Sequence, residues 1–257
     1  MKTLVFDLDG TLYRGTQPIE GGLWVIDECQ RLGIPYAFLT NNSMRTREEN
    51  RDHMLKMGYK NIEADDFYNS AMAAAQYARK NQLGNSADYI GSTGMVQAME
   101  ENSITLNQEN PDLVFIALDK TAGYKDYSRV LSHLLHGAKL VGTNKDRILA
   151  KPGGFEVGNG SVVALFEYAA NTKSPDIAKP YWPILEGFLE TRGLKRGDII
   201  LVGDNLETDI ALGYNNQVST VFVESGVHHR EDIERLKVVP DVIVGDLRDL
   251  DLKALVA

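Results

Sequence analysis

Short apolar runs alternate along the chain with segments of helical periodicity. Five of these runs are rich in β-branched and aromatic residues, as expected of buried parallel strands: Thr3–Phe6, Tyr36–Leu39, Ile199–Val202, Thr220–Val223 and Val242–Val244. The segments between these runs are expected to be helices, because residues typical of helix ends flank them. Such regular alternation predicts an α/β fold, with a Rossmann-like core built on a parallel sheet.

Helix ends are marked by capping residues. Thr46 and Glu49 form a capping-box pattern, and Gly58 stands where that helix is expected to end. Ser70 is the expected N-cap of an alanine-rich helix that runs from residue 71 to about residue 82.

The middle of the chain has the pattern of a second α/β unit. Strands are expected at Asp88–Ile90, Leu113–Leu118 and Lys139–Val141, with helices near 95–101 and 127–136. The stretch Asn171–Pro180 contains small polar residues and prolines, as a return linker does. We therefore expect residues 1–79 and 176–257 to form a core, and residues 80–175 to form an inserted domain.

Composition narrows the range of partners. The net charge of −9 argues against a nucleic-acid polymer or an anionic membrane as partner. The single cysteine, Cys29, excludes an intrachain disulfide, and its apolar neighbours predict a buried core residue. No apolar run approaches a signal-peptide core or a membrane span, so a soluble cytoplasmic protein is expected.

The segment Asp7–Thr11 directly follows the first apolar run. In open α/β sheets, ligands bind just beyond the carboxyl ends of the strands, where these acids emerge. Two carboxylates one residue apart, Asp7 and Asp9, need a cation or a proton between them. Taken alone, the segment is also compatible with a solvated acidic turn.

A second acidic pair follows another strand. Gly203 and Asp204 follow the run Ile199–Val202, and Asp209 comes five residues after Asp204. If the two strands are neighbours, Asp7 and Asp204 can share one hard cation, and Mg²⁺ suits carboxylate oxygens. Asp209 is equally explained as a hydrogen-bonding partner of a metal-bound water or as a first-turn helix acid.

Two further positions supply groups that bind phosphate. Thr40 ends a strand and is followed by Asn41, which together offer a hydroxyl and backbone N–H groups. Lys179 offers an ammonium beside Pro180, although a linker lysine on the surface would look the same. Together with the acids, this is the inventory for phosphoryl transfer through a carboxylate nucleophile.

In this order and spacing, these segments resemble the four motifs of the haloacid dehalogenase (HAD) superfamily. They are most similar to its NagD-like or p-nitrophenyl-phosphatase-like branch, which carries a class II cap. The segments Asp7–Gly15, Leu39–Ser43, Val202–Ile210, Gly142–Asp146 and Gly158–Ser161 carry the resemblance.

The resemblance implies a role for each position. Asp7 would be the nucleophile, and Asp9 would act as general acid and then as base. Mg²⁺ would be held by Asp7, the Asp9 backbone carbonyl and Asp204. Asp209 would contact the ion through a bound water and not directly. The remaining implied residues are Thr40, Asn41 and Lys179 for phosphate, and Asn144, Asp146 and Asn159 for the substrate-facing edge of the cap.

The implied activity is hydrolysis of small phosphomonoesters, such as nucleotide or sugar phosphates, and of p-nitrophenyl phosphate in vitro. A phosphomutase is the first alternative, but the interval between Thr11 and Thr40 is too short for the small cap typical of such mutases. A phosphate-responsive binding protein is the second, although it would not need Asp9. A homodimer through the cap is a further expectation.

Three positions depart from the pattern of the branch. Ala178 replaces a glycine, which is tolerable where φ is negative. Gln217 stands where a glycine usually ends a helix, so that helix must end without one. Lys145 replaces a proline, and its charge beside the cap loop is expected to influence substrate choice.

Overall fold

The structure, a computed structural model, describes residues 1–151 and 153–257. It is an α/β protein, as the alternation of runs predicts, and its chain divides into two compact units. The first unit contains residues 1–40, 47–68 and 188–257, and the second contains residues 41–46 and 69–187. The predicted insertion, 80–175, lies within the second unit, and its role as a substrate-selecting cap stays a prediction.

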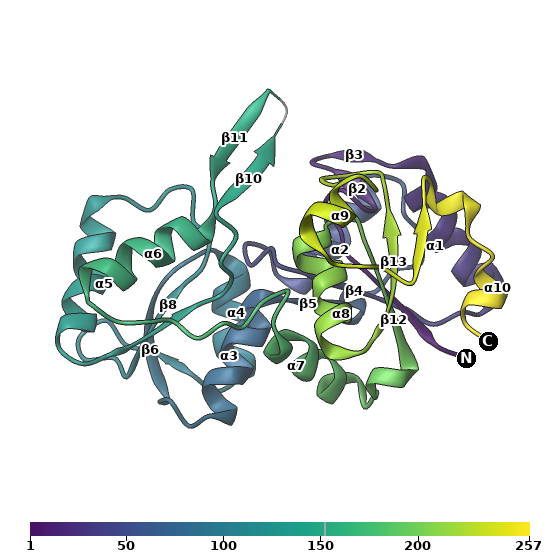
Figure 1. The fold of residues 1–257 in the computed structure, drawn as a ribbon. Coiled ribbons are helices and arrows are strands. Elements are labelled where there is room, and N and C mark those ends of the chain that lie inside the picture. The colour runs from purple at the N-terminus through teal and green to yellow at the C-terminus, as the bar shows by residue number, and fades with distance from the viewer. Residues whose placement is uncertain (152) are drawn as a thin grey trace. The chain divides into compact units, whose positions relative to one another are not determined.

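The strands and α-helices follow one another along the chain in this order (Figure 1): β1 (Thr3–Phe6), β2 (Tyr13–Arg14), β3 (Gln17–Pro18), α1 (Glu20–Leu32), β4 (Tyr36–Thr40), α2 (Arg47–Lys56), β5 (Phe67–Asn69), α3 (Ser70–Lys80), β6 (Ser86–Ile90), α4 (Thr93–Glu101), β7 (Thr105–Leu106), β8 (Leu113–Ile116), α5 (Tyr124–Leu135), β9 (Lys139–Gly142), β10 (Ile148–Lys151), β11 (Gly154–Val157), α6 (Asn159–Ala169), α7 (Trp182–Arg192), β12 (Ile199–Gly203), α8 (Ala211–Asn216), β13 (Ser219–Val223), α9 (Asp232–Leu236), β14 (Val242–Val244) and α10 (Leu252–Leu255).

The main sheet of the chain has the strand order β14-β13-β12-β1-β4-β5. β1 pairs in parallel with β12 on one side and with β4 on the other, and Phe6 lies opposite both Val202 and Phe38. All five strands expected for the core are present, and four of them are buried for most of their length, whereas the edge strand β14 is only partly covered. The Rossmann-like parallel core is therefore confirmed.

Alternate side chains of this sheet enter different clusters. Val221 and Val223 of β13 join the large cluster that includes Cys29 of α1, whereas Phe222 joins a smaller cluster with Leu206 and Ile210. This is the period-two alternation of a strand with both faces covered. Cys29 is fully buried, and burial raises the pKa of its thiol to about 12, which confirms its structural role.

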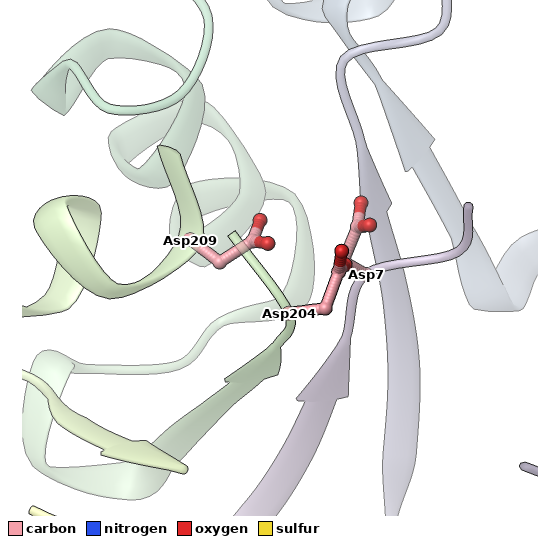
Figure 2. A group of neighbouring side chains, drawn as sticks. All are labelled: Asp7, Asp204 and Asp209. Atoms are coloured by element: carbon pink, nitrogen blue, oxygen red, sulfur yellow. The ribbon is translucent and has the colours of Figure 1, made fainter. Parts of the chain in front are cut away.

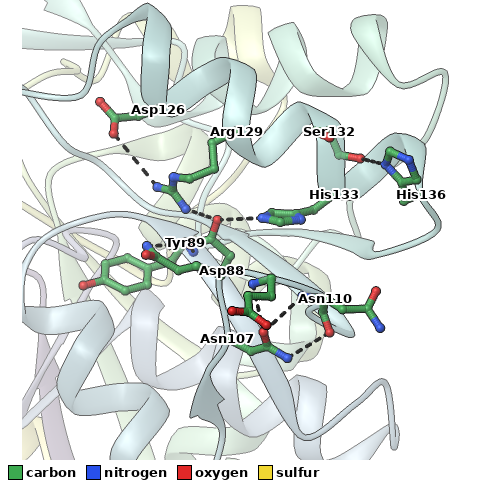
Figure 3. A network of polar contacts seen from close by, with 11 residues as sticks. Asp88, Tyr89, Asn107, Asn110, Asp126, Arg129, Ser132, His133 and His136 are labelled. Carbon is green, nitrogen blue, oxygen red and sulfur yellow. Dashed lines mark hydrogen bonds and ion pairs between the residues drawn. The ribbon is translucent and has the colours of Figure 1, made fainter.

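The second unit has its own parallel sheet, in the order β7-β6-β8-β9, and a hairpin of β10 and β11. Its central strand β8 is buried throughout. Asp88 of β6 is fully buried, and its carboxylate pairs with Arg129 and lies 3.3 Å from His133 Nε2 (Figure 3). Because the two partners lie one turn apart on α5, they tie that helix to the sheet.

Some local expectations were wrong. Asn69, not Ser70, caps α3: its side-chain oxygen accepts from Met72 N at 3.0 Å. The Ser70 hydroxyl instead donates to the Asn41 carbonyl at 2.6 Å. Asparagine and serine are similarly good N-caps, so a tertiary partner decided between them. The short strand β5 and the β10–β11 hairpin were also not foreseen.

No helix within the described residues combines the length and apolar character that crossing a membrane requires.

The end of α8 shows how the helix ends at Gln217, where the related sequences usually have a glycine. Gln217 takes the left-handed conformation, with φ of 57°, and its N–H donates to the Gly213 carbonyl. The helix thus ends in the geometry that usually belongs to glycine. Ala178, in contrast, does not have a positive φ, so its methyl group is accommodated as expected.

Replacing Gln217 by glycine should stabilise the protein. The substitution removes the steric cost of a side chain at positive φ, which is about 1 kcal/mol. We expect the free energy of unfolding, measured by urea denaturation, to rise by about that amount. Asn216→Gly is the matched control: Asn216 is the last residue of the helix, so this change should lower stability by a similar amount. An unchanged or lower stability for Gln217→Gly would contradict the assignment.

Candidate active site

The site begins with the pairing of β1 and β12. Asp7 follows Phe6 at the end of β1, and its N–H donates to the Val202 carbonyl at 2.9 Å. Asp204 follows Gly203 at the end of β12. The two strands are neighbours, which was the condition for Asp7 and Asp204 to share a cation, so both acids emerge at one edge of the sheet.

Asp209 completes an acidic cluster with these two residues (Figure 2). One carboxylate oxygen from each of Asp7, Asp204 and Asp209 lies within 4.8 Å of the others. Asp7 is half-buried, and the other two are buried. Three buried or half-buried carboxylates at this distance repel one another, and oxygen donors are what a hard divalent cation prefers. The cluster therefore fits a metal ion.

Asp204 is held on both of its oxygens. Thr11 Oγ1 donates to Oδ1 at 2.9 Å, and Val227 N donates to Oδ2 at 2.7 Å. Burial, reinforced by the nearby charge of Asp7, raises the pKa of the Asp204 carboxyl above its usual range. The two donors work in the opposite direction and stabilise the charged form. The carboxylate is thus fixed in orientation and electrostatically strained without a cation.

Two glycines allow the close approach of backbone to Asp204. A Cβ at Gly226 would lie 1.8 Å from Oδ2, and a Cβ at Gly10 would lie 2.4 Å from the same atom. Gly10 also has φ of 92°, which other residues rarely adopt. Gly10 lies in the segment Asp7–Thr11 that the sequence singled out, but Gly226 and Val227 were missed, because their loop follows a different strand, β13.

Asp209 lies in a π-type turn, Leu206–Ile210, between β12 and α8. Its Oδ2 accepts from Asn205 N at 3.2 Å, and a Cβ at Gly203 would lie 2.4 Å from the Asp209 side chain. The buried His228 braces the same turn by accepting from Leu206 N at 3.2 Å through Nδ1. His228 is a third residue, after Gly226 and Val227, that spacing along the chain did not reveal.

Asp9 is exposed, and its Oδ1 accepts from Gly15 N at 3.2 Å. Thr40 is buried at the end of β4, the strand next to β1, on the same edge of the sheet as the acids. The first unit thus contains Asp7, Asp9, Thr40, Asp204 and Asp209, five of the predicted site residues.

The other predicted residues belong to the second unit, where Asn41 is hydrogen-bonded to Lys179, Asp146 and Asn144. Its side chain accepts from Lys179 N at 3.0 Å and donates to Lys179 O at 3.1 Å. The amide of Asn41 also donates to Asp146, and its backbone carbonyl accepts from Asn144 at 2.8 Å. Asn159, which is 1 % exposed, donates to Asn144 O at 3.2 Å. These contacts hold the predicted residues together in one hydrogen-bonded group.

The chain matches known proteins over nearly its whole length. Residues 4–105 match the family "Haloacid dehalogenase-like hydrolase", and residues 176–250 match an HAD-hydrolase-like family. The "Acid sugar phosphatase" of Staphylococcus saprophyticus is 32 % identical over 97 % of this chain and 96 % of its own length. The "5'-nucleotidase YutF" of Bacillus subtilis is 32 % identical over 90 % of both chains.

The chain belongs to the haloacid dehalogenase-like hydrolases. The solved structure of NagD from E. coli K-12 superposes with a TM-score of 0.89, at 25 % identity over 98 % of both chains. The resemblance to the NagD-like branch is therefore confirmed, and so is the enzyme class, a phosphatase of the HAD type.

Within this HAD-family chain, Lys145 does not present the free charge that the sequence suggested. Its ammonium lies 2.6 Å from Asp176 and 3.4 Å from Glu167, and it donates to the Ser174 carbonyl at 3.1 Å. Two carboxylates therefore balance the charge of Lys145. The residue ties the loop after β9 to the segment that follows α6, which is a structural role.

Neutralising Asp204 should stabilise the metal-free protein. Asp204→Asn removes one buried charge from the cluster, so in a chelator we expect the free energy of unfolding at neutral pH to rise by about 1 kcal/mol. Magnesium at millimolar concentration should raise the Tm of the wild type but not that of the variant.

The exposed Glu20 provides the control. Glu20→Gln also removes one acid, but from the surface, and should respond to magnesium as the wild type does. A metal-free Asp204→Asn protein that is less stable than the wild type, yet still stabilised by magnesium, would show that the cluster is not the metal site.

Proposed function

We propose that this chain is a Mg²⁺-dependent phosphatase that hydrolyses small phosphomonoesters through an aspartyl-phosphate on Asp7. The observation that supports it best is the cluster of Asp7, Asp204 and Asp209, at the edge of the sheet where Thr40 also lies. A cation bound there would leave Asp7 ionised and accessible, which a carboxylate nucleophile requires.

The carboxylates of Asp7 and Asp204 and the backbone carbonyl of Asp9 would hold magnesium. Asp209, whose orientation is fixed by Asn205, would accept a hydrogen bond from a water of the ion. Bound there, magnesium would offset the carboxylate charge and the charge of the phosphoryl oxygens. The opposing donors on Asp204, Thr11 and Val227, keep its oxygens in place for this task.

The chain's own residues then carry the reaction. An oxygen of Asp7 attacks phosphorus, the bond from phosphorus to the ester oxygen breaks, and Asp9 gives its proton to the leaving oxygen. Asp9 next takes a proton from a water molecule, which attacks the aspartyl-phosphate. Inorganic phosphate leaves, and both carboxyl groups return to their starting states. The exposure of Asp9 is consistent with access to water.

The phosphoryl oxygens need donors that compensate their charge. Thr40 would supply its hydroxyl, Asn41 its backbone N–H and Lys179 its ammonium. Lys179 is 6 % exposed, so its charge is placed by the fold rather than free in solvent. A phosphomutase would use the same groups, but the interval between Thr11 and Thr40 is too short for the small cap typical of such mutases.

The substrates we propose are small sugar phosphates and nucleoside monophosphates. The two relatives described above are named for a sugar phosphatase and for a 5'-nucleotidase. The net charge of −9 and the acidic site argue against a polyanionic polymer or an anionic membrane as partner. A cytoplasmic location and a homodimer through the exposed cap remain predictions. A panel of phosphorylated metabolites, ranked by kcat/KM, would identify the substrate.

Removing the nucleophile should abolish turnover. We expect Asp7→Asn to lower kcat for p-nitrophenyl phosphate with magnesium by at least about 1,000-fold, because the amide cannot attack phosphorus. Asp9→Asn should also lose turnover, with phosphoenzyme accumulating where the leaving group is good enough to depart without an acid. Steady-state assays and intact mass measurements check both expectations.

The control for these variants is Asp27→Asn, at an exposed position of α1. It should keep wild-type turnover, and a chelator should inhibit it as it inhibits the wild type. Near-normal activity of Asp7→Asn, with the fold retained and no reversion to aspartate, would disprove the nucleophile assignment. Full activity of Asp9→Asn would remove Asp9 from the mechanism.

A further inference from the structure

The Asn41 side chain binds both backbone polar groups of one residue, Lys179. Its Oδ1 accepts from Lys179 N at 3.0 Å, while its Nδ2 donates to Lys179 O at 3.1 Å. Both residues are buried, with Asn41 9 % and Lys179 6 % exposed. An amide that satisfies both polar groups of one residue acts like a neighbouring strand. It fixes the backbone from which the Lys179 ammonium extends.

These two hydrogen bonds with Lys179 form in only one orientation of the Asn41 amide. An amide nitrogen carries two protons, and Asn41 Nδ2 has two acceptor groups: Lys179 O at 3.1 Å, and the Asp146 carboxylate, with Oδ1 at 3.2 Å and Oδ2 at 3.3 Å. If the amide were turned over, its oxygen would face the Asp146 carboxylate and its nitrogen would face the Lys179 N–H. Both contacts would then be repulsive. As an acceptor, Asp146 therefore reinforces the orientation that the Lys179 N–H and carbonyl require.

The position of Asp146 is itself fixed. Its N–H donates to Asn144 Oδ1 at 3.2 Å, while Asn144 Nδ2 donates to the Asn41 carbonyl at 2.8 Å. The same carbonyl accepts from Ser70 at 2.6 Å. Behind the loop, Gly158 and Gly160 allow the start of α6 to approach residues 145–147 closely: a Cβ at Gly158 would lie 2.1 Å from Asp146 O. The carboxylate is thus presented to Asn41 by the framework of the second unit.

We propose that Asp146 is a positioning residue that orients the Asn41 carboxamide and, through it, the backbone of Lys179. This inference rests on the proposed function, in which Lys179 neutralises the phosphoryl group. It replaces the expectation that Asp146 faces the substrate. A residue that acts through Lys179 influences the phosphoryl group, which all substrates share, whereas a substrate-facing residue would influence the leaving group, which differs between them.

The test is a comparison of Asp146→Ala and Asp146→Asn. Asp146→Ala removes the acceptor, so kcat/KM should fall about tenfold or more, the usual cost of losing a hydrogen bond to a charged group. The fall should have the same size for p-nitrophenyl phosphate, a sugar phosphate and a nucleoside monophosphate. The inhibition constant of inorganic phosphate should rise in parallel. Asp146→Asn can still accept from Asn41 with its side-chain oxygen, so it should stay within about threefold of the wild type.

Glu100→Ala, at an exposed position near the end of α4, is the control for loss of a carboxylate from the same unit, and should leave every constant unchanged. Asn41→Ala should lower kcat/KM as well, and adding Asp146→Ala to it should cost little more, because both changes break one chain of contacts. Circular dichroism and thermal unfolding check that each variant is folded.

Two results would overturn the proposal. One is an effect of Asp146→Ala that differs by more than about tenfold between substrates, which indicates contact with the leaving group. The other is full additivity of Asn41→Ala and Asp146→Ala in kcat/KM. If Asp146→Ala does not fold, Asp146→Asn decides instead. A fall in kcat/KM for Asp146→Asn as large as that for Asn41→Ala would then overturn the proposal. Failure of the proposed function is a separate result, since the wild type itself would then show no magnesium-dependent hydrolysis.

Discussion

The repulsion between carboxylates at the adjoining ends of β1 and β12 is the interaction on which the rest of the first unit depends. Parallel pairing brings Asp7 and Asp204 together, and the turn after β12 adds Asp209. The surrounding backbone is arranged to tolerate this charge: Thr11 and Val227 donate to Asp204, and glycines leave room for both contacts. Without a cation, the repulsion between these carboxylates lowers the stability of the fold. With a cation bound, the same carboxylates are placed for catalysis, as expected where function and stability make opposing demands.

The parts of this site that could be predicted share one property: the signal is local. An apolar run followed by an acid marks a strand end that points to a ligand, so Asp7 and Asp204 were identified from their own segments. That the two strands are neighbours is not local information. It became predictable through the resemblance of the whole set of segments to a family, and the pairing of Phe6 with Val202 confirms it.

The parts that could not be predicted depend on partners far away in the chain. Asn69 and Ser70 are both good N-caps. Asn69 caps α3, whereas the Ser70 hydroxyl donates to the Asn41 carbonyl. Gly226 and Val227 contribute to the site because β13 lies beside β12, although nothing in their own segment indicates an acid to be held. Lys145 looked like a free charge beside a binding loop, but Asp176 and Glu167 balance it.

The two units divide the predicted residues in a way that bears on specificity. The first unit contains the acids that we propose act on phosphorus, and the second contains Asn41, Lys179 and the loop of Asp146. The Asn41 side chain is hydrogen-bonded to Lys179 and to Asp146. The polar groups that lie next to Lys179 in this network are therefore engaged in contacts within the protein. In our proposal, residues that make such contacts influence every phosphomonoester alike. In our proposal, discrimination between leaving groups therefore comes from side chains outside this network.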